Sequence, residues 1–538
     1  MKHWFVLIGI TLLAFFLRFY QVARIPPSLS WDEVSIGYNA YSILKTGRDE
    51  HGRFLPLNTF VAFGDYKPPI PIYLTVPFVA ILGLNELAVR LPSVIAGTFT
   101  VLLTYFLVKE LFGKSLLTSH LSLITALLLA ISPWHIQLSR AGFEANIALG
   151  EIILGAFMML RSRSAPRLLL VGFLPFVAAI YTFNSARYFS PLVLVGLLFY
   201  GWSSFRAYRR QVGLGLLIAF LFLLPILPHL ASREARLRFA EVNIFTDESV
   251  VRAANARIGF DGFNWWAKLV HNRRWGYLRS YLIHFLDHFQ PSFLFIRGDG
   301  NPKFSLQDIG QLYLVELPFL ILGIFFLAQK YRQKFYLLLF WLLAAIAPAA
   351  VARETPHALR IENSLPTWQI FIAAALVSNI KYQISRNKRA LFIAFCLLLF
   401  AGNFAYFWHN YFNHYASAYS GEWQYGYREA IREIAPLKDQ YPVIYLSEAI
   451  GRPYIYVAFY EQLDPWVFRG AVKGGFDAAG FYNVASLGKY RFVRSDVDKF
   501  LPHSLYILPP NEVPATVKVI STIKLLNGSP ALVIFANP

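Results

Sequence analysis

Apolar runs about as long as one bilayer crossing alternate with polar segments over residues 1–410. An α-helix needs roughly 20 apolar residues to cross a hydrocarbon core of about 30 Å. The pattern therefore predicts an α-helical polytopic membrane protein with about eleven spanning helices. Their expected ranges are 4–22, 87–108, 116–133, 146–160, 168–183, 188–202, 212–230, 311–328, 335–351, 365–380 and 390–408.

The hydrophobic pattern changes after residue 410. Apolar stretches of strand length, separated by Gly, Pro and charged residues, follow at 442–447, 454–459, 504–508 and 531–535, and residues 429–437 carry a helical pattern. We therefore expect a membrane domain over residues 1–410 and a small soluble α/β domain over residues 411–538.

The composition agrees with a membrane protein. The chain is 56% hydrophobic and only 15% charged, far from the balance of an ordinary soluble domain. Its single cysteine, Cys396, excludes an intramolecular disulfide framework and a cysteine metal cluster.

The net charge of +19 comes from basic residues between the apolar blocks, which argues against a nucleic-acid-binding face. With a cytoplasmic N-terminus, every short inside loop is basic, as the positive-inside rule requires. This orientation places the first outer loop (23–86), a large outer loop (231–310) and the C-terminal domain outside the plasma membrane. No small-residue cleavage site follows the first helix, so we expect it to remain uncleaved.

The first outer loop carries the clearest candidate chemistry. Asp32 and Glu33 lie just outside the first helix, where a carboxylate suits a general base or a divalent cation. The alternative is a helix cap, because Ser30 and Asp32 both suit a helix start. Lys67, followed by two prolines, suits a phosphate, and the alternative is a lysine that reaches to the headgroup level.

The second outer loop contains Arg140 and Glu144, four residues apart. On one helix they would form a surface ion pair. A second acidic site is the alternative, because the loop is short and lies between two membrane helices.

Two further outer turns carry arginines, against the topological bias. Tyr181 opens the turn that contains Arg187, and a later loop contains His357 and Arg360. These arginines suit the clamping of phosphate oxygens or contact with anionic headgroups. The loop 231–310 is rich in Trp and Arg, which favours the membrane interface, with stacking on a sugar as the alternative.

The order of these motifs (WDE, KPP, SRAGFE, NSAR and PHALR, before a C-terminal soluble domain) resembles the C-type glycosyltransferases over residues 1–410. It is most similar to the branch of protein O-mannosyltransferases and the aminoarabinose lipid A transferase. The resemblance implies a multipass enzyme that moves a sugar from a polyprenyl-phosphate carrier to a protein, glycolipid or polysaccharide acceptor at the outer membrane face.

The resemblance also implies roles for individual residues. Asp32, with Glu33 beside it, falls on the catalytic base, and Lys67 on the contact to the carrier phosphate. Glu144 falls on the second acidic position, where many relatives have aspartate. Arg187 and Arg360 match basic positions that would neutralise the leaving phosphate. Oligosaccharide-transferring relatives use a divalent ion, whereas the mannosyl and aminoarabinosyl branches do not depend on one, so we expect no metal cofactor.

The expected chemistry is a single displacement with inversion, in which the base deprotonates the acceptor hydroxyl. The competing hypothesis is a transporter or flippase for a lipid-linked or anionic solute, favoured by Glu151 within the fourth helix. A non-catalytic sensor is a third possibility.

Overall fold

The computed structural model describes residues 2–113, 115–232, 242–378, 386–477, 480–494 and 500–537. These residues form two compact units. Unit 1 comprises residues 1–17, 97–138 and 145–405, and unit 2 comprises residues 18–96, 139–144 and 406–538. The expected boundary at residue 410 lies near the start of the last segment of unit 2, but this unit also takes in residues 18–96.

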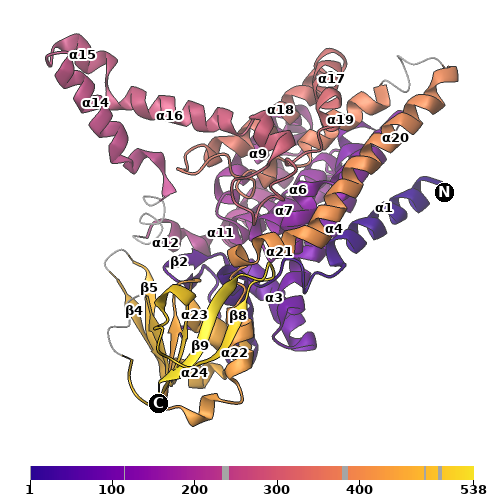
Figure 1. Cartoon of the computed structure of the whole chain (residues 1–538). Coiled ribbons are helices and arrows are strands. Elements are labelled where there is room, and N and C mark those ends of the chain that lie inside the picture. Colours follow the sequence, from indigo (N-terminus) through magenta and orange to yellow (C-terminus); the bar gives the residue numbers. More distant parts are fainter. Residues whose placement is uncertain are drawn as a thin grey trace. The chain divides into compact units, whose positions relative to one another are not determined.

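Unit 1 is built from helices (Figure 1). At its centre, every residue of α19 (Thr367–Ser378) is buried, and α19 packs against α17 (Glu316–Lys330) and α5 (Leu116–Ala130). A Cβ at Gly323 of α17 would lie 1.8 Å from the Phe371 carbonyl oxygen, so this close helix contact requires glycine. Other helices are α1 (Lys2–Phe19), α4 (Glu86–Phe112), α6 (Pro133–Arg140), α7 (Glu144–Arg161), α8 (Leu174–Thr182), α9 (Ala186–Tyr200), α11 (Arg209–Leu223), α18 (Arg332–Ala349) and α20 (Arg386–His409).

Within the described parts of the chain, three helical segments are long and apolar enough to span a membrane. They are Glu86–Phe112, Arg209–Leu230 and Lys388–Tyr419, and a fourth arises if the bent pair Thr118–Ala130 and Pro133–Arg140 is one span. The expected number of eleven is therefore not confirmed. Many apolar helices are shorter than a full crossing, and the end of the expected span 365–380 lies outside the described residues.

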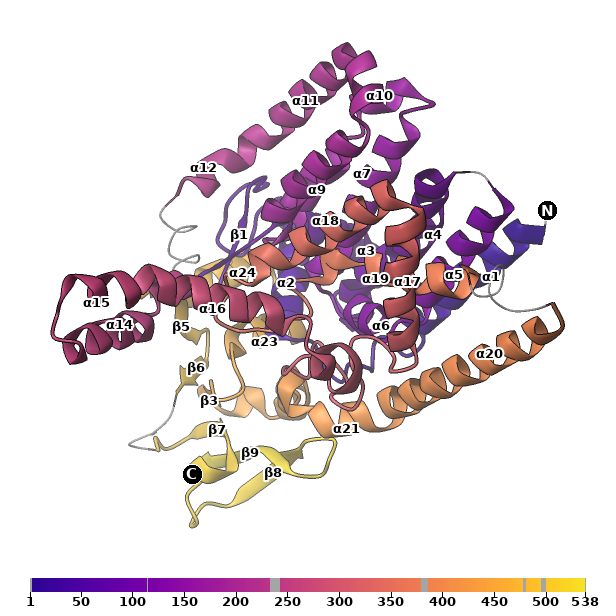
Figure 2. The same cartoon turned by 90° about the horizontal axis from the view of Figure 1, so that it is seen from above.

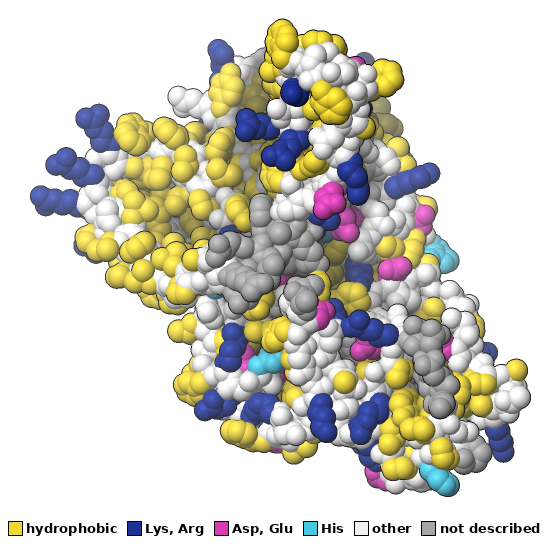
Figure 3. All heavy atoms as spheres, turned by 90° about the vertical axis from the view of Figure 1, so that its left-hand side faces the viewer, with side chains coloured by type: hydrophobic (Ala, Val, Ile, Leu, Met, Phe, Trp, Pro, Cys, Tyr) yellow, Lys and Arg dark blue, Asp and Glu magenta, His cyan; other side chains and the backbone are white. Residues whose placement is uncertain are grey.

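A helical arm, residues 244–287, projects from the other helices of unit 1 and contains α14 (Glu248–Phe260), α15 (Trp265–Val270) and α16 (Arg273–Asp287). In both views α14 and α16 lie side by side (Figures 1 and 2). An Asp or Asn side chain caps each of these helices at its N-terminus. Large apolar side chains are exposed on this arm, including Phe260, Phe263, Trp265 and Leu269. Apolar and basic side chains lie beside one another in the upper part of the face in Figure 3.

Unit 2 begins with α2 (Trp31–Thr46), whose start is a capping box between Ser30 and Glu33. A two-stranded antiparallel hairpin follows, β1 (Phe60–Ala62) and β2 (Asp65–Lys67), and then α3 (Pro69–Leu82), which has prolines in its first turn.

The C-terminal part of unit 2 is a mixed seven-stranded sheet in the order β4-β5-β6-β3-β7-β9-β8. The strand β3 pairs in parallel with β6 and β7, and the other pairings are antiparallel. The strands are β3 (Val443–Ser447), β4 (Val472–Phe476), β5 (Tyr482–Leu487), β6 (Tyr490–Val493), β7 (Ser504–Leu508), β8 (Val519–Lys524) and β9 (Pro530–Asn537). The helices beside them are α22 (Tyr427–Ile434), α23 (Pro453–Tyr460) and α24 (Pro465–Ala471).

These elements confirm an α/β character and correct one expectation. The stretches 442–447, 504–508 and 531–535 lie in strands, and α22 occupies the expected helix. The predicted strand at 454–459 is wrong, because these residues form α23. Pro453 suits the first turn of a helix. The residues of α23 are buried on all sides, so their sequence shows neither the alternating pattern of a strand nor the apolar stripe of a surface helix.

The sheet domain and the first outer loop share one hydrophobic core. The Tyr456 hydroxyl of α23 donates to the Leu29 carbonyl oxygen at 2.9 Å, and the Tyr38 hydroxyl of α2 donates to the Leu463 carbonyl oxygen at 3.1 Å. A Cβ at Gly37 would lie 2.6 Å from the Phe459 ring. The helices α2 and α23 are therefore in close contact, and through them the C-terminal domain packs against the first outer loop.

Candidate active site

Lys67 lies at the centre of a cluster of three carboxylates in unit 2. Its ammonium nitrogen is 2.8 Å from Asp32 Oδ1, 3.0 Å from Asp65 Oδ2 and 3.7 Å from Glu144 Oε1. The Lys67, Asp65 and Glu144 side chains are 10%, 20% and 11% exposed, whereas Asp32 is 37% exposed. Asp32 is therefore the carboxylate that a substrate reaches most easily.

Local structure explains how the cluster forms. Asp32 is in the first turn of α2, and Glu144 opens α7. Asp65 and Lys67 are two residues apart on β2, so their side chains leave the same face of the strand. Pro68 and Pro69 then end the strand and begin α3, which holds Lys67 at the end of the hairpin.

The charges around Lys67 stabilise its protonated form. Burial by itself lowers the pKa of the Lys67 ammonium, but the charges of Asp32, Asp65 and Glu144 outweigh it and raise that pKa well above its ordinary value. Lys67 is therefore a permanent cation. Burial raises the pKa of the Glu144 carboxyl, an effect that Lys67 partly offsets.

Glu33 follows Asp32 in the chain but lies in a different environment. Its carboxylate is buried, with Oε1 2.8 Å from Arg90 Nε and 2.9 Å from the Gly142 amide nitrogen. The other oxygen accepts from the Ser30 amide at 2.9 Å. Glu33 thus completes the helix cap with Ser30, a role that the sequence suggested for Ser30 and Asp32, and Asp32 alone of the two carboxylates faces Lys67.

Arg140 and Glu144 also separate, because α6 ends at Arg140 and α7 begins at Glu144. The buried Arg140 guanidinium donates to the carbonyl oxygens of Arg18, Tyr20 and Ile25 at 3.2, 2.7 and 2.9 Å. Arg140 therefore ties the second outer loop to the segment after the first helix, and Glu144 joins the Lys67 cluster.

The other expected site residues belong to unit 1. The Tyr181 hydroxyl donates to the Phe222 carbonyl oxygen at 2.8 Å, and Arg187 is in the first turn of α9, with Nε 3.5 Å from the Ile180 carbonyl oxygen. His357 Nδ1 lies 3.8 Å from Asp299 Oδ2, and burial lowers the pKa of His357 well below its ordinary value.

Arg360 lies in the same loop of unit 1 as His357. Its guanidinium donates to the Glu354 carbonyl oxygen at 3.2 Å and lies 4.0 Å from the Glu354 carboxylate. Because the Glu354 side chain is 83% exposed, this ion pair is weak.

Sequence reasoning missed two residues. Asp65 completes the carboxylate cluster, and the available signal was its i, i+2 spacing to Lys67, which places two side chains on one face if the segment is a strand. Arg90 is fully buried and donates to the carbonyl oxygens of Val22, Pro26 and Ser28 as well as to Glu33. Arg90 lies within an apolar run, where a charged side chain requires a partner, and this position was the signal in the sequence.

The carboxylates converge on the Lys67 nitrogen. Among the described residues, no group of three or more His, Cys, Asp or Glu side chains has an arrangement that would hold a metal ion. A divalent ion at this site would have to displace the ammonium, so the residues do not fit one as they stand.

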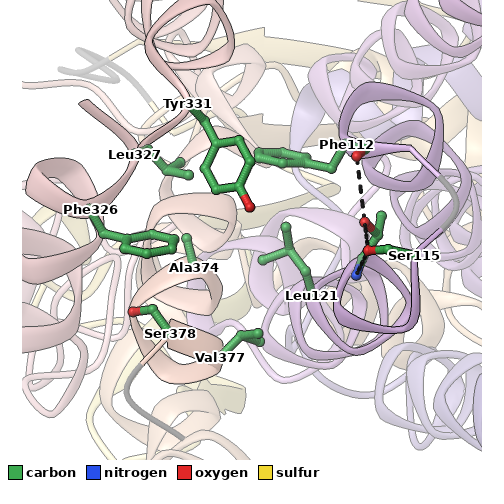
Figure 4. Close-up of a pocket in the computed structure, with 10 residues that line it drawn as sticks. Phe112, Ser115, Leu121, Phe326, Leu327, Tyr331, Ala374, Val377 and Ser378 are labelled. Atoms are coloured by element: carbon green, nitrogen blue, oxygen red, sulfur yellow. Dashed lines mark hydrogen bonds between the residues drawn. The ribbon is translucent and has the colours of Figure 1, made fainter. Parts of the chain in front are cut away.

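Unit 1 contains a cavity of about 60 Å³, whose lining residues are drawn in Figure 4. Tyr331, Ser378 and the bonded hydroxyls of Ser115 and Thr118 are its polar groups. None of its lining residues is acidic, so this cavity offers no general base.

Comparisons with known proteins agree with the expected resemblance. A family described as dolichyl-phosphate-mannose-protein mannosyltransferase matches residues 8–168. A Bacillus subtilis protein named "Putative mannosyltransferase YycA" is 29% identical over 96 residues, which cover 18% of this chain and 13% of that protein.

Two solved structures share the fold over most of the chain. The structure of ArnT from Cupriavidus metallidurans bound to undecaprenyl phosphate matches with a TM-score of 0.52 and 14% identity. The match covers 99% of this chain and 98% of the ArnT chain. The apo oligosaccharyltransferase from Archaeoglobus fulgidus has a TM-score of 0.50 and 14% identity, and covers 86% of this chain and 64% of its own. These likenesses confirm the C-type glycosyltransferase fold.

Proposed function

We propose that this protein is a membrane glycosyltransferase that moves a sugar from a polyprenyl-phosphate donor to an acceptor hydroxyl, with Asp32 as the general base. The observation that carries the proposal is the half-exposed Asp32 carboxylate held 2.8 Å from a buried, permanently charged Lys67. This site belongs to a fold shared with ArnT, whose structure contains undecaprenyl phosphate.

In the proposed step, Asp32 accepts the proton of the acceptor hydroxyl as its oxygen attacks the anomeric carbon. The bond from that carbon to the phosphate oxygen breaks, and polyprenyl phosphate leaves with the bonding electrons. One displacement inverts the anomeric centre. A retaining route would need a second carboxylate as nucleophile, but Asp65 and Glu144 are more buried and face Lys67.

Lys67 has a role in this scheme that differs from the expected phosphate contact. Its three carboxylate partners leave the cluster with excess negative charge, which disfavours an anion beside it. We assign to Lys67 the task of orienting the Asp32 carboxylate, which lies 2.8 Å from its ammonium nitrogen. Arg187 and Arg360 remain the proposed partners of the leaving phosphate, where the developing negative charge requires cations.

The proposal also retains the topology expected from the sequence. Eleven crossings, with a cytoplasmic N-terminus, place the first outer loop and the C-terminal domain outside the plasma membrane. The basic inside loops support this orientation. A lipid-linked donor then meets its acceptor at the outer face, and no nucleotide is required.

The test is release of polyprenyl phosphate from a panel of polyprenyl-phosphate sugars by purified wild type, Asp32→Asn and Asp439→Asn. Asp439 is an exposed residue of the sheet domain, so the control makes the same charge change elsewhere. We expect Asp32→Asn to bind the carrier and to lose at least about a hundredfold in turnover, and Asp439→Asn to match wild type.

Full turnover by Asp32→Asn would show that another group is the base. Wild-type protein that moves a labelled carrier across proteoliposomes without releasing its phosphate would favour the transporter or flippase.

A further inference from the structure

The turn between β3 and α23, residues 448–452, packs against the segment that carries Asp32. Gly451 has φ +137°, and a Cβ there would lie 2.7 Å from the ring of Trp31, the residue before Asp32. Tyr456, one turn further along α23, is bonded to the Leu29 carbonyl oxygen. Two contacts thus hold the start of α23 on the start of α2.

The same turn also contacts the hairpin that carries Asp65 and Lys67. The guanidinium carbon of Arg452 lies 5.5 Å from the centre of the Phe63 ring. Phe63 is two residues before Asp65 and is bridged to it through the backbone. The turn that carries Arg452 therefore contacts both the residue before Asp32 and the hairpin that carries Asp65 and Lys67.

Arg452 differs from the other cations around this site. Lys67 is paired with three carboxylates, and Arg90 is paired with Glu33. Arg452 is half-buried, and within the part of the chain that the structure describes its guanidinium has no ion pair and no hydrogen-bonded acceptor, only the Phe63 ring. Stacking on a ring leaves the N–H groups at the edge of the guanidinium available.

We propose that Arg452 binds a phosphate group at the Asp32 site, so that the C-terminal domain supplies part of the substrate-binding surface. The inference rests on the proposed function, which brings a phosphate to this site. A planar guanidinium matches two phosphate oxygens at once, and a cation is needed there because the carboxylates outnumber Lys67. The phosphate belongs either to the lipid-linked donor or to a phosphorylated acceptor.

The experiment measures binding of undecaprenyl phosphate and the KM values for donor and acceptor in wild type, Arg452→Gln, Arg452→Lys and Arg432→Gln. Arg432 is an exposed arginine on α22 of the same domain, so the last variant is a matched control. We expect Arg452→Gln to bind the carrier about ten- to a hundredfold more weakly, as for a lost charge-assisted hydrogen bond. Arg452→Lys should fall between, because it keeps the charge without the fork, and Arg432→Gln should match wild type.

The outcomes separate the two possible sources of the phosphate. Weaker carrier binding in Arg452→Gln, with an unchanged melting temperature, assigns the phosphate to the donor. Unchanged carrier binding with a raised KM for a phosphorylated acceptor assigns it to the acceptor. If Arg452→Gln has wild-type carrier binding and a wild-type KM for the acceptor, the inference about Arg452 is wrong and the proposed role of Asp32 is unaffected. If the wild-type protein releases no polyprenyl phosphate, the proposed function itself is wrong.

Discussion

At the scale of single residues, the direction of a side chain decides which of two adjacent carboxylates does chemistry. Consecutive residues on an α-helix point about 100° apart. Asp32 therefore reaches Lys67, whereas Glu33 reaches Arg90 and the backbone of Gly142. The fully buried Glu33 is a structural residue, and the exposed Asp32 is the candidate base.

Replacing Lys67 by methionine tests the cation of the cluster. The change removes the ammonium that three carboxylates contact, and loss of one member of a buried ion pair costs about 3–5 kcal/mol. We expect a lower melting temperature and a loss of turnover, because Asp32 loses the ion pair that orients its carboxylate. Lys67→Arg keeps the positive charge and should retain more of both, and wild-type turnover in Lys67→Met would contradict the assignment.

Glu50 provides a pH test within the first outer loop. Burial, with a further contribution from Asp49, raises the pKa of Glu50 from 4.5 to about 8, although a hydrogen bond from Asn39 acts against it. Above pH 4.5 the unfolded chain releases this proton and the folded chain keeps it until about pH 8. The free energy of unfolding therefore falls as pH rises across this window. His51 Nε2 lies 3.9 Å from the Glu50 carboxylate, and burial lowers the pKa of His51, which disfavours its charged form beside Glu50.

We expect Glu50→Gln to remove most of this slope and to raise stability by a few kcal/mol at pH 8. The measurement is the melting temperature from pH 5 to 9, with the exposed Glu433→Gln as control. Equal slopes in Glu50→Gln and wild type would show that Glu50 ionises normally in the folded protein.

At the scale of elements, the hairpin β1–β2 is positioned by the sheet domain. Its turn residue Gly64 has φ +88°, and a Cβ there would lie 2.5 Å from the Gly480 carbonyl oxygen and 2.6 Å from the Phe481 Cα. Arg452 covers the neighbouring Phe63. The strand that carries Asp65 and Lys67 is thus held by residues more than 380 positions further along the chain.

Gly64→Ala tests this contact, and Gly528→Ala is its control, because Gly528 has φ +89° and open space around it. Both variants carry the backbone strain of about 1–3 kcal/mol, but only Gly64→Ala pushes the hairpin away from the sheet domain. We expect a larger fall in melting temperature and a loss of turnover in Gly64→Ala alone. Equal effects in the two variants would show that the contact does not position the site.

At the scale of the whole molecule, the compact units do not follow the order of the chain. The first outer loop and the sheet domain share a core, in which Tyr38, Ile455 and Phe459 are buried. Most of the apolar helices belong to the other unit. The candidate site therefore depends on residues from both ends of the sequence.

A truncated protein that ends at residue 410 tests this organisation. Loss of the sheet domain exposes the apolar face of α2 and removes the residues that contact the β1–β2 hairpin. We therefore expect a poor yield from the membrane and no turnover. The measurement is the detergent-solubilised yield and melting temperature, compared with the full chain. A truncated protein with full-chain stability would show that residues 1–410 are an independent domain.

Sequence patterns alone were sufficient for the membrane class, the helix-rich fold and the C-terminal α/β region, and they selected Asp32, Lys67 and Glu144, which the structure brings together. Hydrophobic runs and the residue types between them are local properties, and the tendency of a segment to be buried follows from them directly. Residues 454–459 escaped this reasoning because α23 is buried on all sides and shows no single apolar face.

Tertiary structure decided the partners of the charged groups. No local pattern indicates that Lys67 contacts Asp65 and Glu144 at once, that Glu33 binds Arg90, or that Arg452 lies over the Phe63 ring from the other end of the chain. Pairing depends on distances between segments far apart in sequence, and these distances exist only after the apolar faces of α2 and α23 have packed together.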